Sequence, residues 1–90
     1  MDPQLTALLA SIAANVRRLR TQQGLTQEAL ADRASQDLSY LQRVERGATN
    51  LSVGVLLALA TALEVAPSRL LRPATLPAVK RGRPRKNAAT

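Results

Sequence analysis

Apolar residues recur at spacings of three and four near the start of the chain, which is the period of an α-helix with one buried face. The stripe comprises Leu5, Leu8, Leu9, Ile12, Ala13, Val16 and Leu19. Asp2 and Pro3 precede it as a capping carboxylate and a proline suited to the first helical position, and Gly24 follows it as a stop. We therefore predict a long first helix that begins at Pro3 and ends before Gly24.

Two shorter helices are predicted next, separated by a turn at residues 35–36. The first spans residues 26–34, with Thr26 as its cap, and the second spans residues 37–46, with Asp37 as its cap. The inward positions of the second are Leu38, Leu41 and Val44, with Tyr40 partly buried beside them, and its outward positions are Ser39, Gln42, Arg43 and Arg46.

A fourth helix, capped by Ser52 and running to about Leu63, is apolar on nearly every side, because Thr61 is its one polar residue after the cap. Such a helix is either central to the core or carries a second buried face. The second possibility implies a symmetric dimer, with a seam shared by Val65, Leu70 and Leu71. Pro67 opens a last short helix that ends at Leu71. A domain of about seventy residues buries only roughly 60% of its surface alone, which favours the dimer.

The composition excludes several classes of function. The chain has no cysteine and no histidine, and its six acidic residues are scattered. It lacks the residues for disulfides, common zinc sites and thiol or imidazole catalysis, so we expect no enzymatic activity, no cofactor and no metal. The longest apolar stretch, at residues 53–60, is shorter than the about 20 residues that span a bilayer. The first residues also lack the basic start of a signal peptide, and we expect a cytoplasmic protein without a membrane partner.

Positive charge is concentrated at the end of the chain. Residues 1–71 hold seven arginines and six acidic residues, whereas residues 72–90 hold six basic residues and no acidic one. Prolines and the loss of helical periodicity predict a folded domain over 1–71, a linker over 72–79, a basic segment over 80–86 and a disordered end over 87–90. The charge favours a polyanionic partner, and nucleic acid ahead of a membrane because no amphipathic apolar face accompanies it.

Residues 26–34 and 37–46 have the helix-turn-helix layout, in which a short helix and a tight turn precede a helix with a polar outer face. Further motifs are Arg20, the run GLTQEALA at 24–31, VERG at 44–47, NLS at 50–52 and the leucine- and alanine-rich helix that follows. Over residues 12–71 the sequence resembles the phage repressor and Cro family of helix-turn-helix domains, also called the XRE family. The resemblance implies a five-helix domain that binds operator double-stranded DNA as a homodimer, with its third helix in the major groove.

The resemblance also implies roles for individual side chains. The candidate contacts to base edges are Asp37, Leu38, Ser39, Gln42 and Arg43, and the candidate contacts to phosphates are Gln27, Arg46, Thr49 and Asn50. Arg20 and Glu45 match a structural ion pair that ties the first helix to the third.

Several of these residues have a second interpretation. Arg43 either bonds both acceptors of a guanine, the commonest specific contact, or is a solvated helix charge. Ser39 and Gln42 could be plain surface residues, and Arg46 either binds phosphate or complements the helix dipole. Arg20, assigned to the ion pair, could instead contact DNA.

Asp37 and Leu38 depart from the neutral or basic polar residues that the family often places there. The Asp37 carboxylate faces phosphates unfavourably, unless it caps the helix or accepts a hydrogen bond from a cytosine amino group. Leu38 either touches a thymine methyl group or joins the core. Direct base readout therefore rests largely on Arg43 and Ser39, and the operator sequence does not follow from it.

The basic segment resembles the AT-hook, a short motif that binds the minor groove, through Lys80, Arg81, Gly82, Arg83, Pro84, Arg85 and Lys86. The narrow A·T-rich groove attracts arginine, glycine lets the backbone approach its floor, and proline keeps the segment extended. The alternative is a basic tail that raises affinity regardless of sequence. A linker over 72–80 spans roughly 25 Å at about 3.1 Å per residue, which allows the segment to reach the duplex beside its own domain.

Two functions remain open. The first is a dimeric, sequence-specific transcriptional regulator that represses by occluding a promoter. Phage-type repressors, restriction–modification controllers and antitoxin-type autoregulators share this domain, and no small-molecule effector is indicated. The second is an architectural, nucleoid-associated protein that bridges A·T-rich DNA with little sequence specificity.

Overall fold

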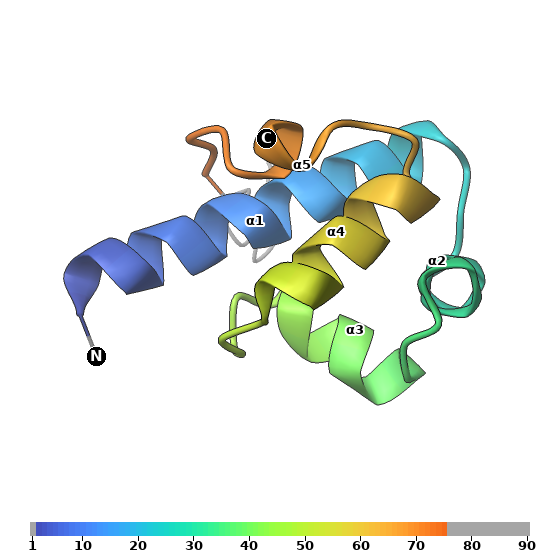
Figure 1. Ribbon diagram of the computed structural model, residues 1–90, viewed down its shortest axis with the longest axis horizontal. Coiled ribbons are helices and arrows are strands. Elements are labelled where there is room, and N and C mark those ends of the chain that lie inside the picture. The colour runs from blue at the N-terminus through green and yellow to red at the C-terminus, as the bar shows by residue number, and fades with distance from the viewer. Residues whose placement is uncertain (1, 76–90) are drawn as a thin grey trace, which may run out of the picture.

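The structure, a computed structural model, describes residues 2–75 (Figure 1). Its helices are α1 (Pro3–Gln22), α2 (Gln27–Ala34), α3 (Leu38–Glu45), α4 (Val53–Ala62) and α5 (Pro67–Leu70). No strand forms within the described residues. The predicted five-helix, all-α fold is confirmed, and the helix bounds lie within one or two residues of those expected.

Three helix starts are capped as the sequence indicates. The side chains of Asp2, Thr26 and Ser52 accept hydrogen bonds from backbone amides of α1, α2 and α4, at 2.7, 3.0 and 3.1 Å. Each bond satisfies an amide that the helix itself leaves without a partner, and each such cap stabilises a helix by about 1 kcal/mol.

Four helix ends share one geometry. The chain turns through the left-handed region at Gly24, Ser35, Gly47 and Glu64, with φ of 70°, 56°, 69° and 61°. At each turn the next amide bonds the carbonyl five positions earlier, at 2.9 to 3.0 Å, which is the Schellman pattern. The sequence placed all four ends to within one or two residues, but only Gly24 and Gly47 are residues that favour this region, whereas Ser35 and Glu64 are not.

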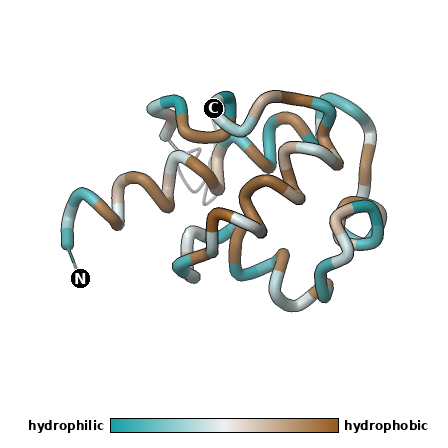
Figure 2. The backbone as a smooth tube through the Cα atoms, viewed as in Figure 1, coloured by the Kyte–Doolittle hydropathy of each residue, from teal (hydrophilic) through white to brown (hydrophobic). Residues whose placement is uncertain are grey.

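The core lies where the helices cross, and Figure 2 shows hydrophobic segments of α1 and α4 meeting there. The largest fully buried apolar side chains are Val16, Leu30, Leu41, Val44, Leu59, Leu63 and Leu70. Tyr40 is partly buried against this core, as expected. Leu70 was predicted to join a dimer seam, but it is buried within its own chain. This expectation is corrected: α5 needs Leu70 as its one buried residue to pack on α1 and α4.

α4 is a core helix, which is the first of the two alternatives that its sequence left open. Leu56, Leu59 and Ala60 are buried in the core. On its other faces Val53 is 80% exposed and Leu57 is 53% exposed. α4 is therefore a core helix that also presents apolar side chains to solvent.

The first turns of α1 project beyond the body formed by the other helices (Figure 1). Burial on α1 begins at Leu9, whereas Leu8 is 41% exposed. None of the helices that the structure describes is long and apolar enough to cross a membrane.

Candidate nucleic-acid interface

α2, the turn after it and α3 form the helix-turn-helix unit. Leu30, Ala31 and Ala34 of α2 and Leu41 and Val44 of α3 are buried, and the two helices pack against each other. The left-handed turn at the end of α2 allows α3 to start after only three residues. This packing fixes which face of α3 points outward.

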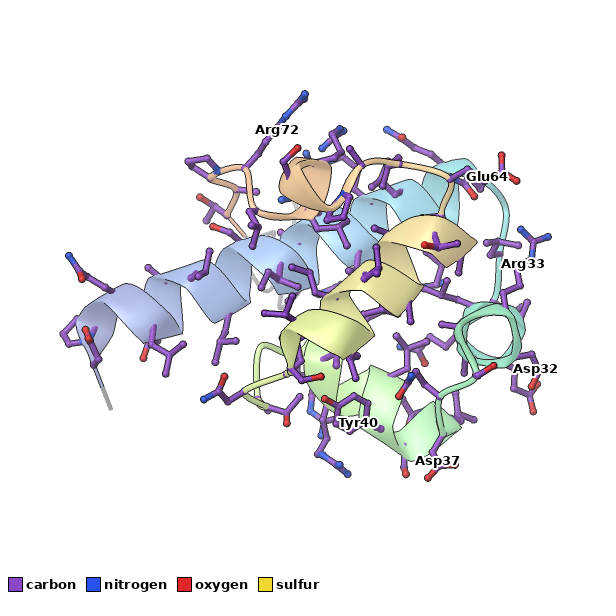
Figure 3. The ribbon with its side chains drawn as sticks, in the orientation of Figure 1. Asp32, Arg33, Asp37, Tyr40, Glu64 and Arg72 are labelled. Atoms are coloured by element: carbon purple, nitrogen blue, oxygen red, sulfur yellow. The ribbon has the colours of Figure 1, made fainter. Side chains whose placement is uncertain are left out.

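The outer face of α3 presents several of the candidate base contacts. Ser39 and Arg43 are exposed, and the guanidinium of Arg43 lies over the Tyr40 ring, 5.3 Å from its centroid. Figure 3 shows Tyr40 on the side of α3 that faces away from α5. A cation held over an aromatic face has fewer accessible conformations, so Tyr40 limits where Arg43 can point. The sequence interpretation missed this contact, although the three-residue spacing on a helix could have indicated it.

The N-terminus of α3 corrects one expectation. Asp37 occupies the N-cap position with extended backbone angles, but its side chain makes no capping hydrogen bond. Its carboxylate is exposed and lies at the outer end of α3 (Figure 3). Two roles were considered for Asp37. Its side chain does not cap the helix, which leaves the role of accepting a hydrogen bond from a cytosine amino group. Leu38 is half-buried beside it and is not part of the core cluster.

The predicted ion pair between α1 and α3 is present. Arg20 Nε donates to Glu45 Oε2 at 2.6 Å and Arg20 Nη2 donates to Glu45 Oε1 at 3.0 Å. Arg20 Nη1 also donates to the Leu25 carbonyl at 2.9 Å, before α2 begins. Glu45 is only 2% exposed, so its charge is compensated almost entirely by these neighbours. The pair fixes α1, α3 and the start of α2 relative to one another.

The ion pair continues into a chain of side chains that the sequence did not indicate. Gln27 Nε2 donates to Glu45 Oε1 at 3.0 Å, and Gln42 Nε2 donates to Gln27 Oε1 at 3.4 Å. A candidate phosphate contact on α2 is thereby joined to a candidate base contact on α3. Both glutamines are half-buried, and their orientation depends on Glu45.

A polar cleft opens beside this network. It is lined by Arg17, Arg20, Gln27, Gln42, Glu45 and Arg46. Because Arg20 and Glu45 compensate each other, Arg17 and Arg46 give the cleft its net positive charge. Both arginines are exposed, which suits the binding of a phosphate. Arg17 was missed in the sequence, where only its three-residue spacing from Arg20 could have indicated it.

Backbone amides are available for phosphate at two helix starts: that of α2, where Gln27 lines this cleft, and that of α4, where Ser52 and Val53 line a separate groove. The first amides of α2 and α4 beyond the capped ones have no partner inside their helices, which suits both helix starts to phosphate. The loop between α3 and α4 places Thr49, which is half-buried, and Asn50, which is exposed, next to the start of α4. A side chain on Gly47 would lie 3.6 Å from the Leu9 carbonyl, so this loop begins in close contact with α1.

An apolar groove lies beside the loop. It is lined by Leu5, Leu8, Leu9, Ile12, Asn50, Leu51, Ser52, Val53, Leu56 and Leu71. Of the predicted dimer seam, Leu71 is 39% exposed at this groove, whereas Val65 is half-buried against the core. The exposed apolar surface thus centres on Leu8, Val53 and Leu71 and not on Val65 and Leu70.

The first part of the predicted linker is ordered against α1. The Asn15 side chain donates to the Leu70 and Arg72 carbonyls, both at 2.9 Å. Ser11 Oγ donates to the Ala74 carbonyl and accepts from the Ala74 amide, both at 3.2 Å. The basic segment 80–86, with its AT-hook-like residues, lies outside the described residues.

Comparison with known proteins matches this architecture to a family. A helix-turn-helix family model, HTH_3, matches residues 16–70. The HTH-type transcriptional regulator y4dJ of Sinorhizobium fredii (strain NBRC 101917 / NGR234) is 40% identical over 62 residues, 69% of this chain and 80% of y4dJ.

Two of the similar solved structures are restriction-modification controller proteins. C.AhdI from Aeromonas hydrophila has a TM-score of 0.67 and 45% identity, covering 69% of this chain and 94% of C.AhdI. C.Esp1396I, as a tetramer in complex with its natural 35-base-pair operator, has a TM-score of 0.65 and 30% identity, covering 70% of this chain and 83% of that protein. The chain therefore belongs to the HTH_3, or XRE-type, family of helix-turn-helix DNA-binding transcription regulators.

Proposed function

We propose that this protein is a sequence-specific regulator that binds operator DNA as a homodimer and represses transcription by occluding a promoter. The observation that carries the proposal is the outer face of α3, where Arg43 is held over Tyr40 beside the exposed Ser39. Likeness to a controller in complex with its operator supports this assignment. Among the regulator types that share the domain, the similar controllers favour a restriction–modification controller.

The roles of the side chains follow from the geometry of the major groove. Arg43 would bond O6 and N7 of a guanine, which contributes about 1–3 kcal/mol of discrimination between bases. The free carboxylate of Asp37 would accept from a cytosine amino group, and Leu38 would contact a thymine methyl group. Ser39 and Gln42 would complete the readout from the same helix.

Phosphate binding would hold α3 in register. The cleft with Arg17 and Arg46 receives one phosphate, assisted by Gln27 and the first amides of α2. Thr49, Asn50 and the first amides of α4 receive a second. These contacts would carry most of the salt dependence and none of the direct sequence readout.

The homodimer would form through the apolar groove of Leu8, Val53 and Leu71. A symmetric pair places two α3 helices on one face of the duplex, which predicts half-sites about 10 base pairs apart or a multiple of this. The basic segment 80–86 adds binding to an A·T-rich minor groove through Arg81 and Arg83.

Selection of bound sites from random DNA by the full chain, followed by footprinting on its own promoter, tests the proposal. We expect a two-fold symmetric site that is preferred over random DNA by more than about 10³ at fixed salt. A ratio below this value would favour the second function, an architectural protein of low specificity. The localisation that follows is the cytoplasm, on the nucleoid.

A further inference from the structure

Four polar side chains form a continuous chain of hydrogen bonds that joins α1, α2 and α3. Glu45 is 2% exposed and accepts from Arg20 at both of its oxygens, at 2.6 and 3.0 Å. Its Oε1 also accepts from Gln27 Nε2 at 3.0 Å, and Gln27 Oε1 accepts from Gln42 Nε2 at 3.4 Å. We call the part that runs from Glu45 through Gln27 to Gln42 the amide relay.

The direction of the amide relay is set at Glu45. A carboxylate has two acceptor oxygens and no donor. The group of Gln27 that lies 3.0 Å from Glu45 is therefore its nitrogen, because an amide oxygen in that place would face a carboxylate oxygen. This orientation turns the oxygen of Gln27 toward Gln42.

The orientation of the Gln42 amide follows from that of Gln27. Its nitrogen faces the Gln27 oxygen at 3.4 Å, which is a long hydrogen bond, but the reverse orientation would place two amide oxygens at the same distance. One hydrogen of this nitrogen is thereby engaged, and the Gln42 oxygen accepts no hydrogen bond from any of residues 2–75. Gln42 thus retains one free acceptor and one free donor hydrogen.

The Gln42 side chain borders both parts of the proposed DNA-binding surface. It is half-buried and follows the exposed Ser39 by three residues, which places the two on the same side of α3. It also lines the polar cleft with Arg17 and Arg46, where a phosphate is proposed to bind. Its free acceptor and donor are therefore placed to meet the edge of a base beside that phosphate.

The bases differ in what they present to such an amide in the major groove. Adenine presents the N6 amino group beside the N7 acceptor, and cytosine presents the N4 amino group alone. Guanine presents the acceptors O6 and N7, and thymine presents the acceptor O4. An amide with a free oxygen and one free hydrogen matches both groups of adenine, whereas its oxygen would face an oxygen of guanine or thymine.

We infer that the amide relay makes Gln42 a reader of adenine, in which Gln42 Oε1 accepts from N6 and Gln42 Nε2 donates to N7. The inference rests on the proposed function, since it requires α3 to lie in the major groove. Gln42 is the residue that determines specificity at this base pair. Glu45 and Gln27 are positioning residues, because they set which end of the Gln42 amide is free.

Titration of modified operators with the full chain tests the contact. Site selection by the wild type and by Gln42→Met, which keeps the side-chain length without the amide, identifies the position where the preference is lost, and we expect adenine there. Replacement of this adenine by 2-aminopurine, which lacks the N6 amino group, should weaken wild-type binding by about 5- to 150-fold. Replacement by 7-deazaadenine, which lacks N7, should cause a smaller loss. Gln42→Met should not distinguish the three duplexes.

The variant Gln27→Met tests the relay itself. It removes the oxygen that holds the Gln42 nitrogen, so the amide is free to reverse. The ratio of affinities for adenine over guanine at this position should fall about fivefold, the equivalent of one hydrogen bond. Binding should also weaken on every sequence, because Gln27 is proposed to assist a phosphate contact, which carries no base preference.

Arg46→Ala is the matched control for Gln27→Met. Arg46 lines the same cleft and is proposed to bind the same phosphate, so its removal should weaken binding without changing the ratio. The ratio compares two duplexes on one preparation of protein, and it therefore does not depend on the fraction that is folded.

Three outcomes would overturn the inference. The first is a Gln42→Met variant that selects the same site as the wild type, and the second is a preference for a base other than adenine at the position that this variant affects. The third is an unchanged ratio in Gln27→Met. Failure of the proposed function is a separate observation, since the wild-type chain would then select no operator at all.

Discussion

At the scale of single residues, Arg43 is the side chain whose position on α3 most directly supports its proposed contact with a DNA base. It lies on the outer face of α3, and its guanidinium stacks over the ring of Tyr40, which lies one turn earlier on the same helix. Sequence reasoning placed both residues on the correct helix and predicted the partial burial of Tyr40. The contact itself depends on side-chain conformations that periodicity does not specify.

We predict that Arg43→Ala lowers operator affinity by about 5- to 150-fold, corresponding to about 1–3 kcal/mol, and relaxes the preference at one base position. Arg43→Lys should lose the same preference, because an ammonium group cannot bond guanine as a fork. Titration of operator variants against each protein measures this. Arg33→Ala, which removes an exposed arginine of α2, is the matched control and should bind like the wild type.

The charge of Glu45 serves to hold helices together, because its carboxylate pairs with Arg20 of α1. It is 2% exposed on the helix proposed to face DNA, where a free carboxylate would repel phosphates, but Arg20 and Gln27 bond both of its oxygens. The sequence motif implied the pair with Arg20. It did not imply the extension to the two glutamines, because that requires the relative placement of α2 and α3.

Glu45→Gln should lower the free energy of unfolding by about 3–5 kcal/mol, because it leaves Arg20 partly buried without its counter-charge. Urea unfolding followed by circular dichroism measures the change, with Glu64→Gln at an exposed carboxylate as control. An equal, small effect in both variants would mean that the ion pair contributes little to stability.

At the scale of helices, starts and ends were both placed within one or two residues, but the starts have the clearer local signals. Starts have local signals, and Asp2, Thr26 and Ser52 each cap the helix that the pattern assigned to them. Ser35 and Glu64 carry no glycine signal for the left-handed region, although both adopt it, with φ of 56° and 61°. Asp37 was also predicted correctly as the N-cap residue of α3, but its side chain does not make the capping hydrogen bond that we expected.

Replacement of Glu64 by glycine should therefore stabilise the domain. The left-handed conformation costs about 1–2 kcal/mol for a residue with a Cβ atom and nearly nothing for glycine, so a gain of about 1 kcal/mol is expected after the entropy of the unfolded chain is included. Thermal unfolding of Glu64→Gly against Glu64→Ala measures it, since alanine retains the strain. A glycine variant no more stable than the alanine variant would contradict the explanation.

The apolar groove between α1 and α4 depends on the turns of α1 that project beyond the body. Leu8 supplies exposed surface there, and Val53 and Leu71 complete it from α4 and from the end of α5. The sequence indicated a surplus apolar surface on α4 but assigned the seam partly to Leu70. Leu70 is buried and its neighbour Leu71 is exposed because of the angle at which the short helix α5 packs on the body. The sequence pattern does not specify that angle.

Leu8→Glu should weaken the dimer by at least about tenfold, because burial of a leucine contributes about 1.5–3 kcal/mol and a charge cannot replace it. Sedimentation equilibrium without DNA measures the dissociation constant. Leu57→Glu is the matched control, since Leu57 is also exposed on α4 but lies outside the groove. Equal weakening by both variants would place the interface elsewhere.

At the scale of the whole molecule, charge is divided along the sequence between a nearly neutral domain over residues 1–71 and six basic residues over residues 72–90. The structure fixes the start of this second part, because Asn15 bonds the Arg72 carbonyl and Ser11 bonds Ala74. From the sequence, we calculated the length of the flexible linker as if it began at Arg72, because no feature of residues 72–75 predicts hydrogen bonds to Ser11 and Asn15. The division of charge was thus visible in the sequence, and the hydrogen bonds that hold residues 72 and 74 against α1 were not.

Salt dependence separates the two parts of the molecule. Neutralisation of the five basic residues in 80–86 should leave the salt slope nearly unchanged on a short operator duplex without an A·T-rich flank, because the minor-groove site proposed for this segment is absent from it. On an A·T-rich duplex without the operator, the same variant should lose about 0.9 units of log–log slope per lost phosphate contact, or about 4 to 5 in total. Fluorescence anisotropy over a salt series measures both slopes. A large loss on the operator duplex as well would mean that the segment binds DNA regardless of sequence, as a plain basic tail.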